Sequence, residues 1–253
     1  CTRVTASPQP GPLDVVCDLD NPGLRLATAQ IFGDQGWRVE IDTDVPLGRG
    51  MGSSAALAVA LAEAYAHATS GDTSHTALMG SAMPVERHFH GNPSGLDVAV
   101  ALHRKPMRFL RGPPMAWTPL RACPWPLVVL DSQVQGRTRE LVDHVQAQRP
   151  DVDPILNAIG ELVDKVANAL EKPEIVGPLV SENHRLLQAL GVSTPELDHL
   201  VDLSLRHGAL GAKLAGAGGG GVVFALMRTH ADAQALCDVA NEAGVVAWTC
   251  QAL

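Results

Sequence analysis

The sequence predicts an α+β fold, and three features support this prediction. The segment "WRVEIDTDV" (37–45) alternates apolar and polar residues, which is the pattern of a half-buried strand. The segment "GRGMGSSAALAVALAEAYA" (48–66) places a glycine loop directly before an alanine-rich helix. In the second half, strand-like and helix-like stretches alternate along the chain. A length of 253 residues is enough for one large or two small domains with a substantial core.

The first half predicts short strands and helices on both sides of the glycine loop. Predicted strands cover 2–7, 13–19 and 37–45, and predicted helices cover 23–36, 53–66 and 73–88. We expect Gly36 to close the first of these helices. Turn-forming residues in "HGNPSGLD" (90–97) then precede "VAVALH" (98–103), which fits either a helix or a strand.

The second half begins with a proline-rich segment, 106–126, that indicates strands, turns and a crossing between two lobes. Strands are expected at 126–131, 222–227 and 245–250, and helices near 137–148, 154–171 and 229–243. The segment "STPE" predicts a further helix that starts with a capping box, in which Ser193 accepts from the N–H of Glu196.

Composition excludes several classes of protein. The net charge is −8, and the Lys and Arg residues are scattered, which argues against a nucleic-acid partner. No apolar run approaches the ~18 residues that a membrane span needs, so we expect a soluble protein without a membrane partner. The five cysteines are odd in number and lack CxxC spacing, which favours buried reduced thiols and a cytoplasmic location. They are Cys1, Cys17, Cys123, Cys237 and Cys250.

The alternating glycines of "GRGMGSS" (48–54) suit an anion, because backbone N–H groups without a neighbouring Cβ can approach it closely. The helix that follows adds the positive end of its dipole, and phosphate is the natural guest. The alternative is a tight strand-to-helix turn that needs glycine only for positive φ. Ser53 and Ser54 would serve as helix N-caps, or as one cap and one hydroxyl ligand for a nucleotide-bound Mg²⁺.

A second glycine cluster, "KLAGAGGGG" (213–221), immediately precedes a predicted strand. Four consecutive glycines cost entropy on folding, so they indicate close approach of a ligand or of another backbone segment. A flexible hinge is the alternative.

Two carboxylates lie between the glycine clusters in "ERHFHGNPSGLD" (86–97). Glu86 and Asp97 could converge on one site, where one would hold Mg²⁺ and the other would accept or orient a hydroxyl proton. Asp97 could instead be an ordinary helix N-cap. His88 and His90 fit surface or hydrogen-bonded histidines better than zinc ligands, because their spacing does not make a zinc site.

Together, the three segments resemble the GHMP kinase superfamily. "PLGRGMGSSAA" (46–56) is similar to the family's phosphate-loop motif, and "KLAGAGGGG" to its C-terminal motif. "ERHFHGNPSGLD" is similar to the mevalonate kinase pattern E-x-x-x-H-G-N-P-S-G-x-D. The resemblance implies two α+β lobes with the active site between them. The first lobe would resemble domain 2 of ribosomal protein S5 and the second would be ferredoxin-like, with lobes at 1–124 and 125–253.

The resemblance also implies roles for individual residues in an ATP-dependent kinase of a small alcohol. The phosphate-binding residues would be Gly48, Gly50, Met51, Gly52, Ser53, Ser54 and Ala55. Ser54 and Glu86 would complete the coordination of Mg²⁺, and Asp97 would act on the C5 hydroxyl of mevalonate. The acceptor pocket would be formed by His90, Gly91, Ser94, Gly216, Ala217, Gly218 and Gly219. A homodimer is expected only because dimers occur in the family.

The chain departs from the family pattern in four places. The family's N-terminal lysine motif has no counterpart in "CTRVTASPQPG" (1–11). Its first part, "CTRVTAS" (1–7), resembles the strand that follows that motif, so we expect a segment ahead of position 1. Ala215 stands where Thr is usual, and Val98 where Asn is common. Arg49 replaces a small residue in the phosphate loop and would contact a phosphate or point to solvent.

These features leave three rival functions open. The nearest is another kinase of the superfamily, acting on phosphomevalonate, homoserine or a sugar. A non-catalytic nucleotide-binding homologue is the second. A dinucleotide-binding redox domain is disfavoured, because the first glycine loop has the wrong spacing for it.

Overall fold

The computed structural model describes residues 2–18, 22–45, 48–112, 114–121 and 123–251. Within these residues the chain forms two units, which are treated separately below. The N-terminal unit contains the described residues up to 45, together with Gly52–Arg104 and Phe109–Trp117. The C-terminal unit contains Gly48–Met51, Lys105–Arg108 and the residues from Thr118 onward. The predicted lobe boundary at 124 stays a prediction.

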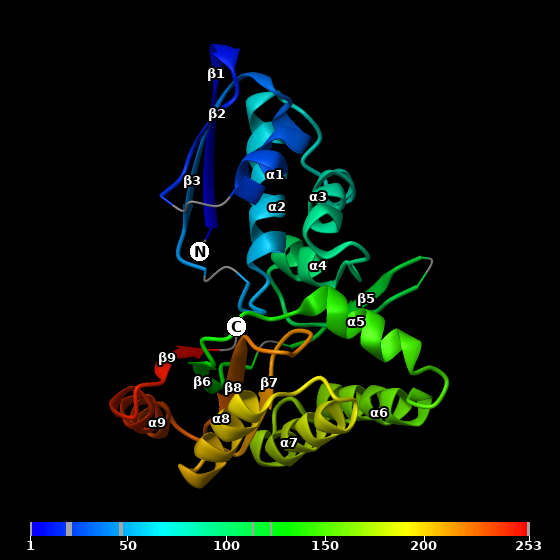
Figure 1. Cartoon of the computed structure of the whole chain (residues 1–253), viewed down its shortest axis with the longest axis vertical. Helices are drawn as coiled ribbons and strands as arrows, with labels where there is room; N and C mark the ends of the chain where they lie inside the picture. The colour runs from blue at the N-terminus through cyan, green and yellow to red at the C-terminus, as the bar shows by residue number, and fades with distance from the viewer. Residues whose placement is uncertain (1, 19–21, 46–47, 113, 122, 252–253) are drawn as a thin grey trace. The chain divides into compact units, whose positions relative to one another are not determined.

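The N-terminal unit combines a three-stranded sheet with four helices (Figure 1). The sheet has the order β1-β3-β2, with β1 antiparallel and β2 parallel to β3. Its strands are β1 (Thr2–Pro12), β2 (Asp14–Val16) and β3 (Gln35–Thr43). Its helices are α1 (Pro22–Phe32), α2 (Ser53–Ala68), α3 (His75–His90) and α4 (Leu96–His103).

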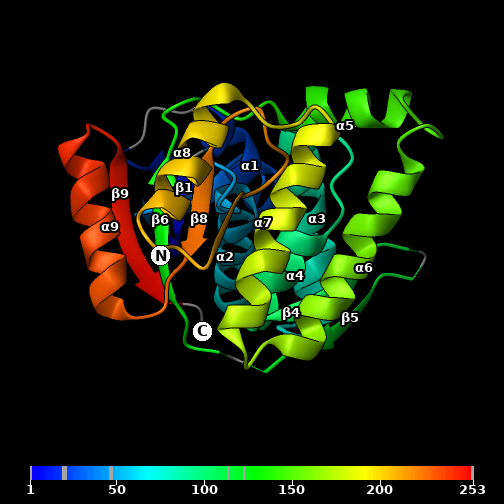
Figure 2. The ribbon, with the colours of Figure 1, turned by 90° about the horizontal axis from the view of Figure 1, so that it is seen from below.

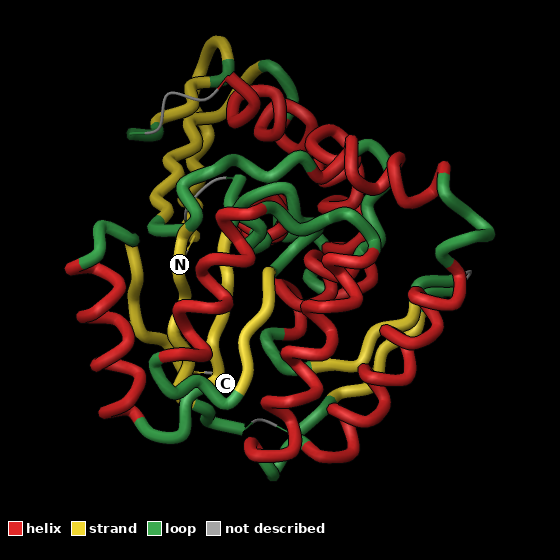
Figure 3. The backbone as a smooth tube through the Cα atoms, turned by 60° about the horizontal axis from the view of Figure 1, so that its bottom comes forward, coloured by secondary structure: helices red, strands yellow, loops and turns green. Residues whose placement is uncertain are grey.

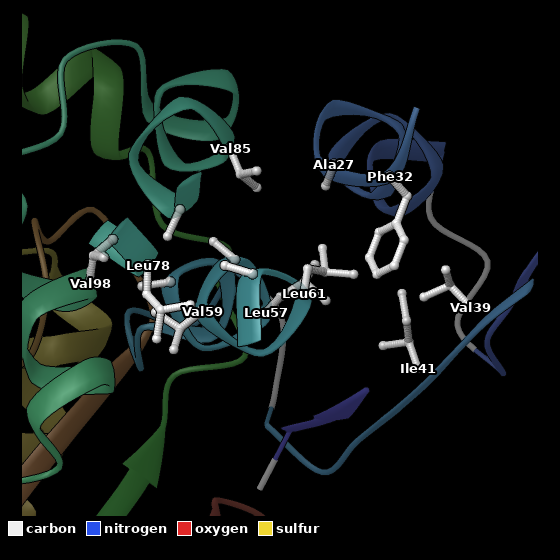
Figure 4. Close-up of a cluster of buried hydrophobic side chains, with 14 of the residues drawn as sticks. Ala27, Phe32, Val39, Ile41, Leu57, Val59, Leu61, Leu78, Val85 and Val98 are labelled. Atoms are coloured by element: carbon white, nitrogen blue, oxygen red, sulfur yellow. The ribbon is translucent and has the colours of Figure 1, made fainter. Parts of the chain in front are cut away.

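The core of the N-terminal unit is built on β3 and α2. Val39 and Ile41 of β3 are buried and the intervening Glu40 is exposed, which confirms the predicted alternation. Helix α2 is largely buried because alanine and leucine cover most of its surface, and Leu57 and Leu61 join the same apolar cluster (Figure 4). The helix that carries Ser53 and Ser54 at its start is therefore fixed by the core of its own unit.

The C-terminal unit is built on a four-stranded antiparallel sheet of order β7-β8-β6-β9. Its strands are β6 (Pro126–Asp131), β7 (Gly211–Leu214), β8 (Val222–Leu226) and β9 (Val246–Gln251). Its helices are α5 (Thr138–Ala147), α6 (Asp153–Ala169), α7 (Pro173–Ala189), α8 (Pro195–Arg206) and α9 (His230–Glu242). The short strands β4 (Met107–Leu110) and β5 (Ala116–Pro119) form a separate two-stranded sheet.

Helices α8 and α9 cover one face of the four-stranded sheet (Figure 2). Leu197 and Leu236 from the two helices, and Val128 and Leu214 from the sheet, are almost completely buried in one cluster. Helix α7 packs beside the edge strand β7 and also against α6. Strands and helices occur in both units, so the predicted α+β class is confirmed (Figure 3).

Several local predictions were wrong. Helix α1 ends at Phe32 and is followed by Gly33, which has φ of 75°, whereas Gly36 belongs to β3. Helix α7 and the short strand β7 were not predicted as such. The cap of α8 is Thr194, whose hydroxyl accepts from the N–H of Leu197 at 3.4 Å, and not Ser193.

The cysteine prediction was only partly right. Cys17, Cys123, Cys237 and Cys250 are free thiols, but only Cys237 is buried, and Cys250 is exposed. Cys1 lies outside the described residues, as do positions 19, 46 and 47 of the predicted strand and phosphate loop. Among the described residues, no helix is long and apolar enough to cross a membrane.

Candidate active site

The first glycine loop has the backbone that an anion-binding turn requires. Gly48, Gly50 and Gly52 have φ of 71°, 74° and 70°, a region that residues with a Cβ rarely adopt. Gly52 is the N-cap of α2 and provides no side chain to cap the helix, so the N-cap alternative for Ser53 and Ser54 was wrong. The first N–H groups of α2 therefore lack a side-chain cap from this position and lie at the positive end of the helix dipole.

Ser54, Glu86 and His90 meet at the start of α2. The hydroxyl of Ser54 donates to Oε1 of Glu86 at 3.2 Å, and it lies 2.9 Å from Nε2 of His90. Nε2 of His90 is 3.4 Å from the same Oε1, because Glu86 and His90 are one helical turn apart on α3. Two helices therefore bring a hydroxyl, a carboxylate and an imidazole together.

Glu86 carries an ionisable carboxyl group that is buried in the protein. It is only 2% exposed, and its Oε2 is buried and has no hydrogen-bond partner in the part of the chain that the structure describes. Burial is the largest influence on the pKa of Glu86 and raises it, the hydrogen bond from Ser54 lowers it, and the charge of Asp97 raises it, so that the pKa reaches about 7. A buried carboxylate oxygen beside a serine hydroxyl is an oxygen donor set that suits Mg²⁺.

Asp97 lies in the first turn of α4, two residues after Gly95, which is the N-cap. The alternative in which Asp97 is itself the N-cap was therefore wrong. The side chain of Asp97 is exposed to solvent. The surrounding protein nevertheless desolvates its carboxyl group and raises the pKa of that group, whereas the charge of His90 lowers it. Glu86, His90 and Asp97 thus influence one another electrostatically, although they come from two helices.

The "HGNPSG" turn connects α3 to α4. Gly91 ends α3 by donating its N–H to the carbonyl of Arg87, and the hydroxyl of Ser94 accepts from the N–H of Leu96 at 3.2 Å. The side chain of Arg111 donates to Oδ1 of Asn92 at 2.8 Å, which places an exposed guanidinium beside this turn. Nothing local in the sequence marked Arg111, because it lies in the proline-rich segment and reaches the turn through tertiary contact.

In the C-terminal unit, residues 48–51 of the first glycine loop pack against the second glycine cluster. A Cβ built on Gly50 would lie 3.1 Å from the carbonyl oxygen of Ala215, and one on Gly221 would lie 2.6 Å from the carbonyl oxygen of Arg49. The N–H of Gly136 donates to the carbonyl of Gly48 at 3.4 Å. These glycines are required because two backbone segments approach each other closely.

The run of four glycines is packed on other backbone segments too. A Cβ on Gly218 would overlap the carbonyl oxygen of Val192, and one on Gly220 would lie 2.6 Å from that of Val134. The N–H of Gly219 donates to the carbonyl of Val192 at 2.9 Å. Close approach of another backbone, one of the two expected reasons for the glycines, is therefore confirmed. The flexible-hinge alternative does not account for these contacts.

Arg49 is paired inside the C-terminal unit. Its guanidinium lies 3.4 Å from Oδ1 of Asp131 at the end of β6, and the side chains are 27% and 11% exposed. Oδ1 of Asp131 also accepts a hydrogen bond from the N–H of Gln133 at 2.7 Å. The alternative in which Arg49 points to solvent was wrong, because the side chain is largely buried beside a carboxylate.

The structure divides the predicted site residues into two groups. The N-terminal unit holds Gly52, Ser53, Ser54, Ala55, Glu86, His90, Gly91, Ser94 and Asp97. The C-terminal unit holds Gly48, Gly50, Met51, Gly216, Ala217, Gly218 and Gly219. Sequence reasoning missed Asp131 and Arg111, whose relevance comes only from their contacts with the predicted motifs.

Family models cover both units. Residues 23–105 match the model described as GHMP kinases N terminal domain, and residues 163–246 match the one described as GHMP kinases C terminal. The chain belongs to the GHMP kinases.

Mevalonate kinases are among its relatives. The mevalonate kinase of Pyrococcus horikoshii is 39% identical over 153 residues, which are 56% of this chain and 45% of that protein. The mevalonate kinase of Aeropyrum pernix is 35% identical over 161 residues, 60% of this chain and 48% of that protein. The aligned part of the chain thus spans about half the length of these relatives.

Solved structures of the family have the same fold. The crystal structure of L. major mevalonate kinase in complex with R-mevalonate matches with a TM-score of 0.86 at 23% identity, covering 99% of this chain and 86% of that one. Streptococcus pneumoniae phosphomevalonate kinase, in complex with phosphomevalonate and AMPPNP, matches with a TM-score of 0.80 at 18% identity, covering 99% and 90%. The predicted two-lobe GHMP kinase fold is confirmed.

Proposed function

We propose that this protein transfers the γ-phosphoryl group of ATP to the C5 hydroxyl of (R)-mevalonate and forms 5-phosphomevalonate. The observation that carries this proposal is the cluster of Ser54, Glu86 and His90 at the uncapped start of α2, with Asp97 electrostatically coupled to it. The mevalonate kinases that match at 35–39% identity support mevalonate as the acceptor.

The start of α2 is proposed to bind the phosphates of ATP. The backbone N–H groups of Gly48, Gly50, Met51, Gly52, Ser53, Ser54 and Ala55 would donate to phosphate oxygens, with the dipole of α2 adding positive potential. Ser54 and Glu86 are proposed to hold Mg²⁺, since the buried Oε2 of Glu86 has no other partner among the described residues. The bound ion would neutralise charge on the transferring phosphoryl group.

Asp97 is proposed to orient the acceptor hydroxyl and to take its proton. The hydroxyl oxygen would form a bond to the γ-phosphorus while the bond to the ADP oxygen breaks. The raised pKa of Asp97 makes its carboxylate a better proton acceptor than an ordinary aspartate. Most of the rate enhancement would still come from positioning and from stabilisation of charge.

The acceptor pocket is proposed to comprise His90, Gly91, Ser94, Gly216, Ala217, Gly218 and Gly219. Mevalonate carries a carboxylate, which calls for a cation. Arg111 provides one beside the turn that contains Ser94, because its guanidinium is fixed by Asn92 and exposed to solvent. Ala215 is the position at which another acceptor would be accommodated differently from a typical family member, whereas the side chain of Val98 is buried in the core of the N-terminal unit.

The proposal is tested by acceptor-dependent release of ADP from Mg·ATP. The full-length protein, expressed from its complete reading frame, is assayed with mevalonate, phosphomevalonate, homoserine and a sugar panel. We expect turnover with mevalonate above the others. Preference for another alcohol would assign a different kinase of the family, and ATP binding without turnover on any acceptor would indicate a non-catalytic homologue.

The role of Glu86 has its own test. Glu86→Gln removes the charge but keeps the shape, so we expect half-maximal turnover to need several-fold more Mg²⁺. The matched control is Glu63→Gln, because Glu63 on α2 is a partly exposed carboxylate that pairs with Arg104. Identical Mg²⁺ titrations for Glu86→Gln and wild type would exclude the metal-binding role.

Location and assembly are further parts of the proposal. Free thiols at Cys17, Cys123, Cys237 and Cys250 support a cytoplasmic protein, because such thiols persist in reducing compartments. A homodimer rests on family resemblance alone and is tested by light scattering of the purified protein.

A further inference from the structure

The second glycine cluster is held at both ends by hydrogen bonds to residues outside it, namely the imidazole of His184 on α7 and the backbone carbonyl of Val192 between α7 and α8. Upstream, the N–H of Leu214 donates to Nδ1 of His184 at 3.4 Å, two residues before Gly216. Downstream, the N–H of Gly219 donates to the carbonyl of Val192. Hydrogen bonds therefore attach the turn 215–219 to His184 on one side and to the segment that contains Val192 on the other.

One carboxylate connects these two supports. Oδ1 of Asp198 lies 3.1 Å from Nε2 of His184, and it accepts from the hydroxyl of Ser193 at 2.5 Å. Ser193 directly follows Val192 in the chain. Asp198 thus binds both the imidazole that supports Leu214 and the residue next to the carbonyl that supports Gly219.

The geometry fixes the state of the imidazole. His184 is 3% exposed, and its Nδ1 accepts from a backbone N–H, so this nitrogen carries no proton. Nε2 must then carry the proton and donate it to Asp198. The ring is neutral, and both of its nitrogens are used, so its orientation is fully determined.

A second side chain of α7 contacts the same strand without reaching the turn. The hydroxyl of Ser181 accepts from the N–H of Ala212 at 3.3 Å, one helical turn before His184. Strand β7 is an edge strand, so outward N–H groups without a partner strand need such acceptors. Ser181 provides a matched control, because it supports β7 but is not connected to Asp198 by any hydrogen bond of the described residues.

We propose that His184, Asp198 and Ser193 form a positioning network that fixes the turn 215–219 and thereby sets the affinity for the acceptor alcohol. This inference rests on the proposed function, in which Gly216, Gly218 and Gly219 line the acceptor pocket. None of the three network residues touches a reacting atom in this scheme. Their effect is transmitted through Leu214 and Val192.

The kinetic test uses Asp198→Ala, which removes both hydrogen bonds to the carboxylate while leaving Thr194 to cap α8. We expect the KM for the acceptor to rise about tenfold, which lies within the range for the loss of these two hydrogen bonds, with kcat and the KM for ATP within about twofold. Asp198→Asn retains an acceptor oxygen and should restore most of the acceptor affinity. Ser181→Ala should leave all three constants unchanged.

The structural test does not need activity. Amide hydrogen exchange of Gly219 should be about tenfold faster in Asp198→Ala than in wild type, and unchanged in Ser181→Ala. If wild type lacks turnover on every acceptor, the proposed function fails while this measurement still tests the network. Unchanged Gly219 exchange in Asp198→Ala overturns the proposal, as does an equal rise of the acceptor KM in Ser181→Ala.

Discussion

The burial of Glu86 has a consequence for stability that needs no ligand. Folding raises the pKa of this carboxyl group from 4.5 to about 7. The native state therefore favours the protonated form of Glu86. The stability that this protonated group contributes is fully present below pH 4.5 and is lost as the pH rises through 7. Each pKa unit corresponds to ~1.4 kcal/mol, so the cost of ionising Glu86 at pH 8 has an upper limit of about 3.5 kcal/mol.

Glu86→Gln removes this cost, because glutamine is neutral at every pH and can still accept from Ser54. The variant should have nearly the wild-type free energy of unfolding at pH 4.5, and should be more stable than wild type by about 2 to 3 kcal/mol at pH 8. Urea unfolding followed by circular dichroism from pH 4.5 to 8.5 measures the difference.

Glu161→Gln is the matched control for loss of one carboxyl group, since Glu161 is exposed on α6. Stability curves of Glu86→Gln and wild type that stay parallel across this range would show that burial of Glu86 does not raise its pKa. A variant that is less stable than wild type at pH 8 would show the same.

Two further predictions concern the C-terminal unit. Gly218→Ala should lower the free energy of unfolding by about 2 to 5 kcal/mol, because the backbone there is left-handed and the new Cβ meets the carbonyl of Val192. Gly208 also has a positive φ, of 88°, but a Cβ there would meet no atom within 4 Å. Gly208→Ala should therefore lower the free energy of unfolding by only about 1 to 2 kcal/mol. Equal urea midpoints for the two variants would contradict the close packing. Arg49→Met and Asp131→Asn should each destabilise the protein and show a coupling of about 1 kcal/mol in a double-mutant cycle, because their ion pair is largely buried. Additive effects would mean that the pair contributes nothing.

Much of the fold could be predicted from local patterns. The period-2 alternation was sufficient to predict β3, and the glycine loop followed by an alanine-rich stretch was sufficient to predict α2. Each pattern reflects a local rule of backbone geometry. The exact helix ends were less predictable. Ser193 and Thr194 are adjacent hydroxyl residues, and the choice of Thr194 as cap depends on Ser193 being bound to Asp198.

Elements without a strong pattern were missed for physical reasons. Helix α7 contains Pro178, which normally argues against a helix interior, and β7 is only four residues long. Both are stabilised by each other, because Gly177 and Gly211 allow their backbones to approach closely. Such tertiary stabilisation is not visible in a local window of sequence.

The residue types of the candidate site could be inferred from the sequence, but their contacts could not. Glycine spacing and the segment 86–97 pointed to Ser54, Glu86 and Asp97, whereas the hydrogen bond between Ser54 and His90 spans 36 positions of the chain. The pairing of Arg49 with Asp131 likewise depends on a contact that spans much of the sequence. Chemistry can be inferred from residue types, but partners across the fold require coordinates.

The most direct test of the central claim compares wild type with Asp97→Asn in mevalonate-dependent release of ADP from Mg·ATP. We predict turnover in the wild type and a loss of at least about 100-fold in the variant, with nucleotide affinity retained, because Asp97 acts on the acceptor and not on ATP. Retained turnover in Asp97→Asn would remove Asp97 from the mechanism. Absence of turnover on mevalonate in the wild type would contradict the proposed activity itself.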